Sequence, residues 1–215
     1  MSRTVFRVRN REMRMKKIVS VLVMAMALMV GSATAVRADF AAGMKAFDAG
    51  NYSIALQEAR PLAEQGMAKA QYLLGRMYSD GHGVAQNYKE AAKWMRKAAE
   101  QGHAGGQLTI GFYYQKGRGG VPQDDDEAVK WIRKAAEQGH AVAQLNLGFI
   151  YDKGRSVLRD KILAHMWSNI SAANGFTIAS NARTLFEMRM TASQIAEAQE
   201  LARKCMKQNY KGCGR

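Results

Sequence analysis

The sequence predicts an all-α protein, specifically an α-solenoid of stacked antiparallel helix pairs. Three blocks recur at spacings of 36 and 37 residues, beginning Ala-Gln-Tyr-Leu-Leu-Gly at Ala70, Gly-Gln-Leu-Thr-Ile-Gly at Gly106 and Ala-Gln-Leu-Asn-Leu-Gly at Ala143. Each block continues to a tyrosine, a glycine loop and a tryptophan, and no stretch shows the strict alternation of a β-strand. A period of this length is typical of helical hairpins that bury their apolar faces only against their neighbours.

The first element, residues 1–38, has the pattern of a Sec-type secretory signal peptide. Two lysines precede an apolar run at residues 18–30, which is too short to span a bilayer. Small residues then place the expected cleavage site after Ala38, with residues 33–35 as the alternative site. An uncleaved N-terminal anchor is the competing interpretation. We expect a periplasmic or secreted protein with no transmembrane segment after cleavage.

Residues 39–67 predict a shorter, capping hairpin. Alanines at helical spacing suggest two helices joined at Gly50-Asn51. Pro61 removes one backbone donor inside the second helix, so a kink is expected there rather than a break.

The three repeat units are expected at residues 68–103, 104–140 and 141–176. In the first unit Leu74 and Tyr78 share one face of the first helix, beside Gly75, and this glycine recurs as Gly111 and Gly148, which suggests that the partner helix approaches closely. In each second helix small residues flank one tryptophan. The expected structural core of the repeats comprises Leu74, Gly75, Tyr78, Trp94, Gly111, Tyr114, Trp131, Gly148, Tyr151 and Trp167.

Differences among the units lie in their loops. Gly120 is an extra residue in the second loop and explains why the spacing alternates between 36 and 37. Asn87 and Asp124 are expected to cap the second helices. The third unit has lost a loop glycine, so residues 141–176 are expected to be a degenerate repeat.

Residues 177–215 predict a C-terminal helical cap and a basic tail. Residues 181–188 and 191–206 have helical patterns, and Thr191 with Gln194 forms a capping box. Cys205 and Cys213 are eight residues apart, and in an oxidising compartment they are expected to form a disulfide. Free or intermolecular thiols are the alternatives.

The repeat units share the pattern Ala-x-Tyr/Leu-x-x-Gly-x-x-Tyr-x-x-Gly-x-Gly-Val followed by Ala-x-x-Trp-x-x-Lys-Ala-Ala-Glu-Gln-Gly. It resembles the Sel1-like repeat, a relative of the tetratricopeptide repeat, over most of residues 40–205. This resemblance implies a right-handed superhelix used as an adaptor in envelope processes or protein contacts. Cysteine-rich relatives carry a disulfide in every repeat, whereas these repeats contain no cysteine. The wall-fragment binding of those relatives is therefore not carried over.

No catalytic, cofactor-binding or metal-binding residues are predicted. His103 and His140 occupy the same repeat position, which explains them better than a site does. No histidine has metal-ligand spacing to another ligand. The acidic run at residues 124–127 is explained by a helix start.

Charge narrows the choice of partner. The formal net charge is +14, but residues 1–38 carry eight basic groups and one acid. Residues 39–152 balance at 13 against 13, and residues 153–215 carry 11 basic and four acidic groups. No nucleic-acid partner is expected, because once residues 1–38 are removed the basic surplus is confined to residues 153–215. A solvated basic face without a partner is the plain alternative to a basic binding surface.

We therefore expect an exported, non-enzymatic scaffold that binds a protein or peptide partner in the envelope. Tyr72 and Tyr113 are the candidate partner-facing residues, because the first helix of each pair tends to line the inner surface of such stacks. The main alternative is a module for an anionic envelope polymer, such as peptidoglycan or exopolysaccharide, bound by the basic C-terminal region. A cell-wall hydrolase is a distant third.

Overall fold

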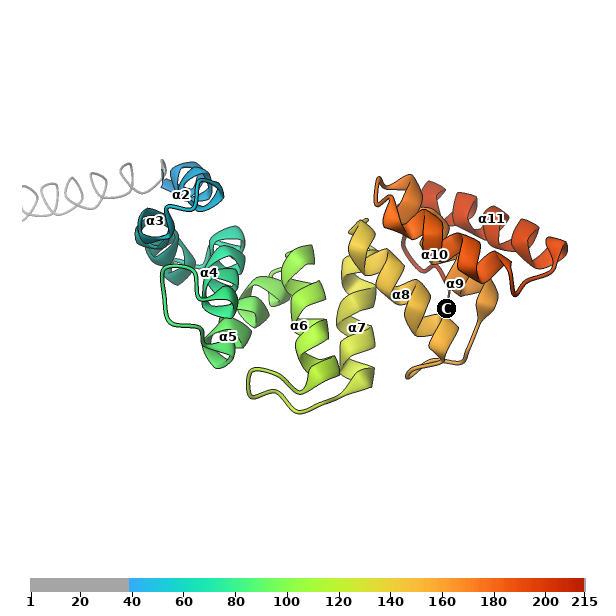
Figure 1. Ribbon diagram of the computed structural model, residues 1–215, viewed down its shortest axis with the longest axis horizontal. Coiled ribbons are helices and arrows are strands. Elements are labelled where there is room, and N and C mark those ends of the chain that lie inside the picture. Colours follow the sequence, from blue (N-terminus) through green and yellow to red (C-terminus); the bar gives the residue numbers. More distant parts are fainter. Residues whose placement is uncertain (1–38, 215) are drawn as a thin grey trace, which may run out of the picture. The chain divides into compact units, whose positions relative to one another are not determined.

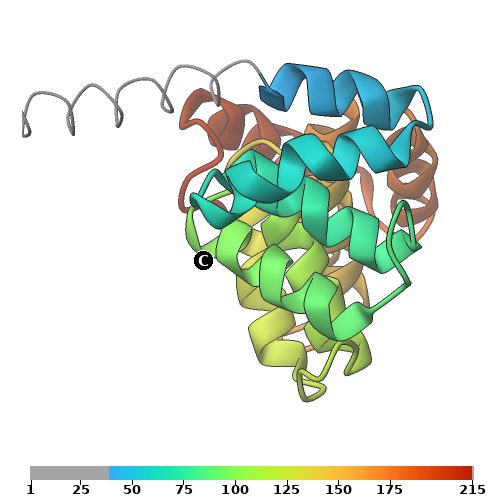
Figure 2. The same ribbon diagram turned by 90° about the vertical axis from the view of Figure 1, so that its left-hand side faces the viewer.

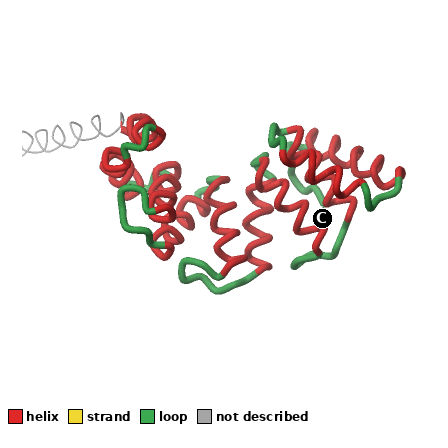
Figure 3. The backbone as a smooth tube through the Cα atoms, in the orientation of Figure 1, coloured by secondary structure: helices red, strands yellow, loops and turns green. Residues whose placement is uncertain are grey.

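The structure is a computed structural model that describes residues 39–214. The expected signal peptide at residues 1–38 lies outside this range. Every regular element within residues 39–214 is an α-helix (Figure 3). The helices are α2 (Asp39–Asp48), α3 (Tyr52–Glu64), α4 (Ala68–Asp80), α5 (Tyr88–Glu100), α6 (Ala104–Lys116), α7 (Asp125–Ala136), α8 (Ala141–Lys153), α9 (Lys161–Ala173), α10 (Ile178–Glu187) and α11 (Ala192–Lys207) (Figure 1).

The chain divides into two compact units at Glu58, within α3. In the first unit α2 lies beside the first turns of α3 (Figure 2), and the rings of Phe47 and Tyr52 meet edge-on with centroids 5.4 Å apart. Gly50 adopts a positive φ of 77° between the two helices, as the predicted joint requires. Helix α3 continues through Pro61.

In the second unit, helices α4 to α9 pack as three successive pairs. Helix α4 packs on α5, α6 on α7 and α8 on α9, while α5 also contacts α6 and α7 contacts α8. Buried alanines line these contacts because a small side chain lets helix axes approach closely, and they include Ala91, Ala98, Ala128 and Ala135. The predicted stack of helix pairs is therefore confirmed.

The third pair is covered at its far side. Helices α10 and α11 both pack on α9, and they extend the core around Trp167 with Phe186 and Ala202. Helix α11 begins with the predicted capping box of Thr191 and Gln194. The apolar surface of α9 on this side of the stack is therefore buried under α10 and α11.

The loops follow the sequence predictions. Residues 117–124 form a loop one residue longer than those at 81–87 and 154–160, and Gly120 accounts for the difference. The side chains of Asn87 and Asp124 accept hydrogen bonds from backbone N–H groups of the first turns of α5 and α7. Both caps satisfy donors that the helix itself leaves unpaired.

The recurring glycine of each first helix lies against its partner helix. A Cβ atom added at Gly148 would lie 2.9 Å from the carbonyl oxygen of Ala164 and 2.9 Å from the hydroxyl of Ser168. At Gly75 the nearest atoms belong to the flexible side chain of Met95, at 3.0 Å. Close packing is thus present at both glycines. Gly148 faces backbone and a serine hydroxyl of the partner helix, whereas Gly75 faces a flexible side chain.

This difference predicts unequal effects of the same substitution. Gly148→Ala is expected to lower the free energy of unfolding by about 1–3 kcal/mol, because the new methyl group overpacks a rigid contact. Gly75→Ala is expected to be near neutral, since about 1 kcal/mol gained in helix propensity offsets the shift of Met95. Urea unfolding followed by circular dichroism measures both, and equal losses would contradict the proposed difference.

Candidate interaction surfaces

Three buried glutamines join neighbouring segments of the stack. Gln71, Gln107 and Gln144 occupy the same position in α4, α6 and α8 and are at most 5% exposed. Each donates from Nε2 to a carbonyl oxygen near the end of the preceding helix, in the pairs Gln71–Ala63 (3.1 Å), Gln107–Ala99 (3.2 Å) and Gln144–Ala136 (3.1 Å). Each also accepts at Oε1 from an amide that ends its own unit, in the pairs with Gln101 (2.7 Å), Gln138 (2.6 Å) and Asn174 (2.8 Å). The stack therefore has a repeated polar bridge at every junction.

A second repeated contact places an arginine on the tyrosine of the next unit. The pairs are Arg60–Tyr78, with Nη2 3.4 Å from the hydroxyl, Arg96–Tyr114, with Cζ 5.3 Å from the ring centroid, and Arg133–Tyr151, with Nη2 2.7 Å from the hydroxyl. Tyr151 is buried, whereas Tyr78 and Tyr114 are half-buried. Tyr78 and Tyr151 thus meet the guanidinium through their hydroxyls, whereas Tyr114 meets it through the face of its ring.

The tryptophans differ between units. Trp167 is fully buried, but Trp94 and Trp131 are half-buried, with the ammonium groups of Lys97 and Lys134 4.3 and 4.2 Å from their ring centroids. The difference follows from the cap, because α10 and α11 cover α9 alone among the three second helices. Of the other predicted core residues, Leu74, Gly75, Gly111 and Gly148 are all buried.

The expectation that Tyr113 faces a partner is wrong. Its side chain is 5% exposed, its hydroxyl lies 3.3 Å from that of Ser79, and its ring packs edge-on against Tyr88. Burial raises the pKa of this phenol. Tyr113 therefore belongs to the contact between the first two repeats, because its helical position turns toward α5 rather than toward solvent.

Tyr72, the other candidate, is half-buried and lies on α4 at the seam with α6. Its ring stacks on the imidazole of His103 with centroids 4.4 Å apart. A Cβ at Gly105 would come within 2.9 Å of the ring, so the absence of a side chain there makes room for it. Tyr72 thus bridges two first helices and exposes part of its ring.

Half-buried side chains continue this face along α6 and α8, and they include Thr109, Phe112, Val142 and Asn146. Thr109 and Asn146 occupy equivalent positions, and each donates from its side chain to the carbonyl four residues earlier in its own helix. We call the set Tyr72, Thr109, Phe112, Val142 and Asn146 the first-helix surface. It combines aromatic, aliphatic and hydrogen-bonding groups on three consecutive repeats.

His103 and His140 have a structural role that the sequence did not reveal. They precede α6 and α8, and their Nδ1 atoms accept hydrogen bonds from the backbone N–H groups of Gly106 (3.1 Å) and Ala143 (3.4 Å). Burial is the main cause that lowers the pKa of both imidazoles, and the charge of His140 lowers that of His103 further. Each histidine is therefore an N-cap that works in its neutral form.

These caps predict a loss of stability on acidification. Because the folded-state pKa values lie below the ordinary histidine value of 6.5, the unfolded chain binds more protons as the pH falls through that value. The stabilisation is complete above about pH 6.5 and is lost as the pH falls toward the folded-state pKa values. The double variant His103→Asn/His140→Asn keeps a capping side chain without this titration.

Unfolding in urea at pH ~7.5 and ~5.5 tests this prediction, because one pH lies above and the other below the ordinary histidine pKa of about 6.5. The natural chain is expected to lose on the order of 1 kcal/mol more than the double variant, which is the typical worth of an N-cap. Identical pH dependence in the two proteins would show that the caps do not titrate.

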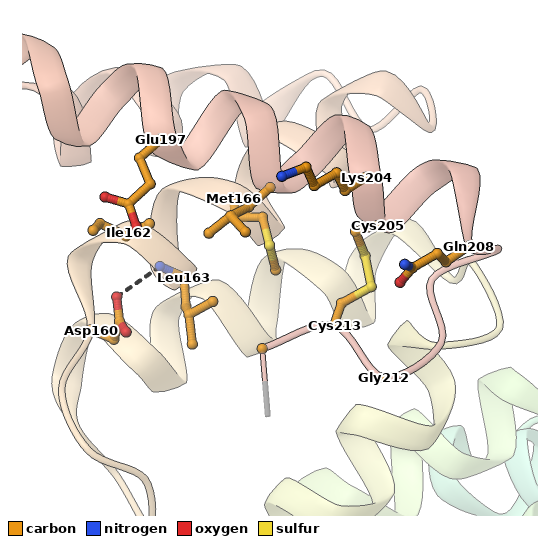
Figure 4. Close-up of a pocket in the computed structure, with 12 residues that line it drawn as sticks. Asp160, Ile162, Leu163, Met166, Glu197, Lys204, Cys205, Gln208, Gly212 and Cys213 are labelled. Atoms are coloured by element: carbon orange, nitrogen blue, oxygen red, sulfur yellow. Dashed lines mark hydrogen bonds between the residues drawn. A yellow bond between two sulfur atoms is a disulfide. The ribbon is translucent and has the colours of Figure 1, made fainter.

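The C-terminal end contains a cavity of about 420 Å³ between α9, α11 and the tail (Figure 4). Leu163 and Met166 lie at its base, and the disulfide between Cys205 and Cys213, whose Cα atoms are 5.6 Å apart, forms one wall. The tail is also held by a hydrogen bond of 2.7 Å from the Tyr151 hydroxyl to the carbonyl oxygen of Gly214. The cavity wall is thus fixed by both a covalent and a polar contact.

Two other properties of residues 39–214 bear on function. These residues contain no group of three His, Cys, Asp or Glu side chains that could hold a metal ion. No helix among them is long and apolar enough to cross a membrane. In the acidic run, Asp124 caps α7 and Glu127 pairs with Lys130 at 2.6 Å, so both carboxylates have structural partners.

Comparison with known proteins agrees with this architecture. The Sel1 repeat family model matches residues 68–103, 106–140 and 141–176. The crystal structure of a Sel1 repeat protein from Oxalobacter formigenes is 36% identical with a TM-score of 0.65, over 70% of this chain and 60% of that one. The crystal structure of c5321, a protective antigen present in uropathogenic Escherichia coli strains that displays an SLR fold, is 30% identical with a TM-score of 0.55, over 73% of this chain and 42% of that one.

This chain therefore spans less than two thirds of the length of either relative. No curated protein sequence matches it.

Proposed function

Since this chain belongs to the Sel1 repeat family, we propose that it is an exported, non-catalytic scaffold that binds a protein partner in the cell envelope. Sel1 repeats are a protein-interaction type of scaffold, and stacks of this kind present extended binding surfaces. Export is supported by the sequence pattern of residues 1–38 and by the disulfide between Cys205 and Cys213, a bond typical of oxidising compartments.

The observation that carries this proposal is the first-helix surface. Tyr72 and Phe112 are large rings that are only half-buried, and Thr109 on α6 and Asn146 on α8 add hydrogen-bonding groups to the same surface. Partly exposed aromatic anchors with neighbouring polar groups are characteristic of protein interfaces. Because the surface continues over α4, α6 and α8, it suits an extended segment of a partner.

Site-specific photo-cross-linking in intact cells tests the proposal. The photoreactive amino acid p-benzoylphenylalanine replaces Phe112 on the first helix of the second repeat, and Trp131 on the second helix of the same repeat serves as control. Both positions hold half-buried aromatic rings, so the perturbation is matched. A covalent adduct with another protein is expected at 112 and not at 131, with the adduct identified by mass spectrometry.

Adducts of equal yield at both positions, or adducts with copies of the same chain only, would overturn the proposal. Recovery of the adduct in the periplasmic fraction of the cells would support export. An adduct confined to cytoplasmic proteins would contradict that part.

A specific observation supports the anionic-polymer alternative. Lys153, Arg155, Arg159 and Lys161 are all exposed around the loop between α8 and α9. Such a cluster binds polyanions through interactions that salt screens. Retention on immobilised peptidoglycan that disappears at moderate ionic strength would favour the polymer, whereas a partner retained in high salt would favour the first-helix surface.

A further inference from the structure

A second surface lies on the other helix of the first repeat. A cavity of about 490 Å³ opens between α5 and the loop at residues 117–124. We call it the α5 groove, and its lining comprises Lys89, Glu90, Ala92, Lys93, Trp94, Arg96, Lys97, Gly119, Gly120 and Val121. None of these residues belongs to the first-helix surface.

The loop is seated directly on the start of α5. A Cβ at Gly119 would lie 2.5 Å from the carbonyl oxygen of Tyr88, so only glycine permits this approach. The guanidinium of Arg118 lies 4.5 Å from the centroid of the Tyr88 ring and fixes the loop from outside. Gly120, the residue that makes this loop longer than the other two, lies beside the Lys89 side chain and lines the groove.

The charge of the groove distinguishes α5 from α7. Lys89, Lys93 and Lys97 follow one another at intervals of four residues, so they share one face of α5, and all three are exposed. The equivalent positions of α7 are Asp126, Lys130 and Lys134, which mix both signs. Glu90 is the sole acid in the lining, and it pairs with Lys93 at 2.6 Å. The groove therefore favours an anionic occupant.

The floor of the groove is apolar. Ala92, Val121 and the partly exposed Trp94 all line the groove, and the ammonium group of Lys97 lies 4.3 Å from the centroid of the Trp94 ring. That ammonium group occupies one face of the indole, where a sugar ring would otherwise stack. An aliphatic or aromatic side chain can instead enter the floor while carboxylates on either side meet the lysines.

We propose that the α5 groove binds an acidic segment of a partner protein, with an apolar side chain in the floor and flanking carboxylates on Lys89, Lys93 and Lys97. The proposal rests on the scaffold function above and adds to it the chemistry of the bound segment and a second site. The two surfaces lie on different helices, so a partner can occupy the groove whether or not the first-helix surface is occupied.

Fluorescence anisotropy tests the proposal with a fluorescein-labelled peptide of repeated Asp-Leu-Glu-Phe. Two companion peptides carry glycine in place of the apolar residues or lysine in place of the acidic ones. The variant Lys93→Glu/Lys97→Glu reverses the groove charge, and Lys130→Glu/Lys134→Glu is its matched control, because Lys134 covers Trp131 as Lys97 covers Trp94. The groove variant is expected to bind about tenfold or more weakly than the natural chain, and the control within about twofold of it.

Deleting Gly120 provides a second variant that leaves every charge in place. It shortens the loop to the length found in the other two repeats and is expected to weaken binding because the loop wall of the groove moves. Circular dichroism and thermal unfolding verify that each variant is folded. The glycine and lysine peptides are expected to bind weakly to all proteins.

Several outcomes would overturn the proposal. These are no binding of the acidic peptide, equal weakening in the groove and control variants, or binding of the glycine peptide as tight as that of the full one. A fluorescent polyphosphate or heparin oligomer could bind more tightly than the acidic peptide and lose this binding in the groove variant. That result would assign the groove to a polyanion instead. If the peptide fails while cross-links at Phe112 persist, the groove proposal falls and the scaffold function stands.

Discussion

Replacing Gln144 by methionine is expected to lower the free energy of unfolding by about 2 kcal/mol. The glutamine is fully buried, and its amide joins the carbonyl oxygen of Ala136 to the side-chain amide of Asn174. Methionine has a similar shape but makes neither hydrogen bond, and each lost bond costs about 1 kcal/mol. For a chain of this length the midpoint of thermal unfolding should fall by roughly 4–8 °C.

Urea unfolding of Gln144→Met measures this loss, with Gln57→Met as the control on an exposed helical glutamine. The control is expected to stay within about 0.5 kcal/mol of the natural chain. The equivalent substitution of Gln107 should behave like that of Gln144, because its amide also donates to a carbonyl oxygen and accepts from a side-chain amide. Equal stability of the Gln144 variant and the control would show that the hydrogen bonds of Gln144 do not stabilise the junction between repeats.

Replacing both Cys205 and Cys213 by serine is expected to cost about 2–3 kcal/mol. The disulfide closes a short segment of chain, and the loss of that constraint in the unfolded state gives this magnitude. The folded state is affected as well, because the tail carries the Gly214 carbonyl that Tyr151 contacts. Release of the tail should therefore also open one wall of the C-terminal cavity.

The measurement compares the double serine variant with the natural chain, each in the presence and absence of a reducing agent. Reduction should bring the natural chain to the stability of the variant and leave the variant unchanged. Two free thiols in the natural chain purified without reductant would contradict the bond itself. A variant as stable as the oxidised natural chain would show that the hydrogen bonds alone hold the tail.

Sequence periodicity predicted the helical stack because each unit must repeat the residues that fit it to the next. The caps at Asn87, Asp124 and Thr191 were predictable for a similar reason, since a local hydrogen bond needs only local sequence. The extra length of the middle loop followed from counting, with Gly120 as the added residue. These features depend on spacing along the chain.

Features that depend on contacts across units were missed or misplaced. Tyr113 and Tyr72 both lie on first helices, yet only the structure shows that Tyr113 turns toward Tyr88. Trp167 differs from Trp94 because α10 and α11 cover α9, and that cover comes from outside the repeat. The role of Gln71, Gln107 and Gln144 had a visible signal, because the same polar residue recurs at one position of every repeat.

The covered end of the third repeat determines how a chain of this kind can change in length over evolution. Met166, Trp167 and Ile170 are buried under α10 and α11, where the first two repeats carry lysines at two of the equivalent positions. A unit duplicated after residue 176 would separate this apolar surface from its cover and expose it. A unit duplicated between the first and second repeats would instead meet the same glutamine and arginine–tyrosine contacts on both sides, so lengthening is favoured there.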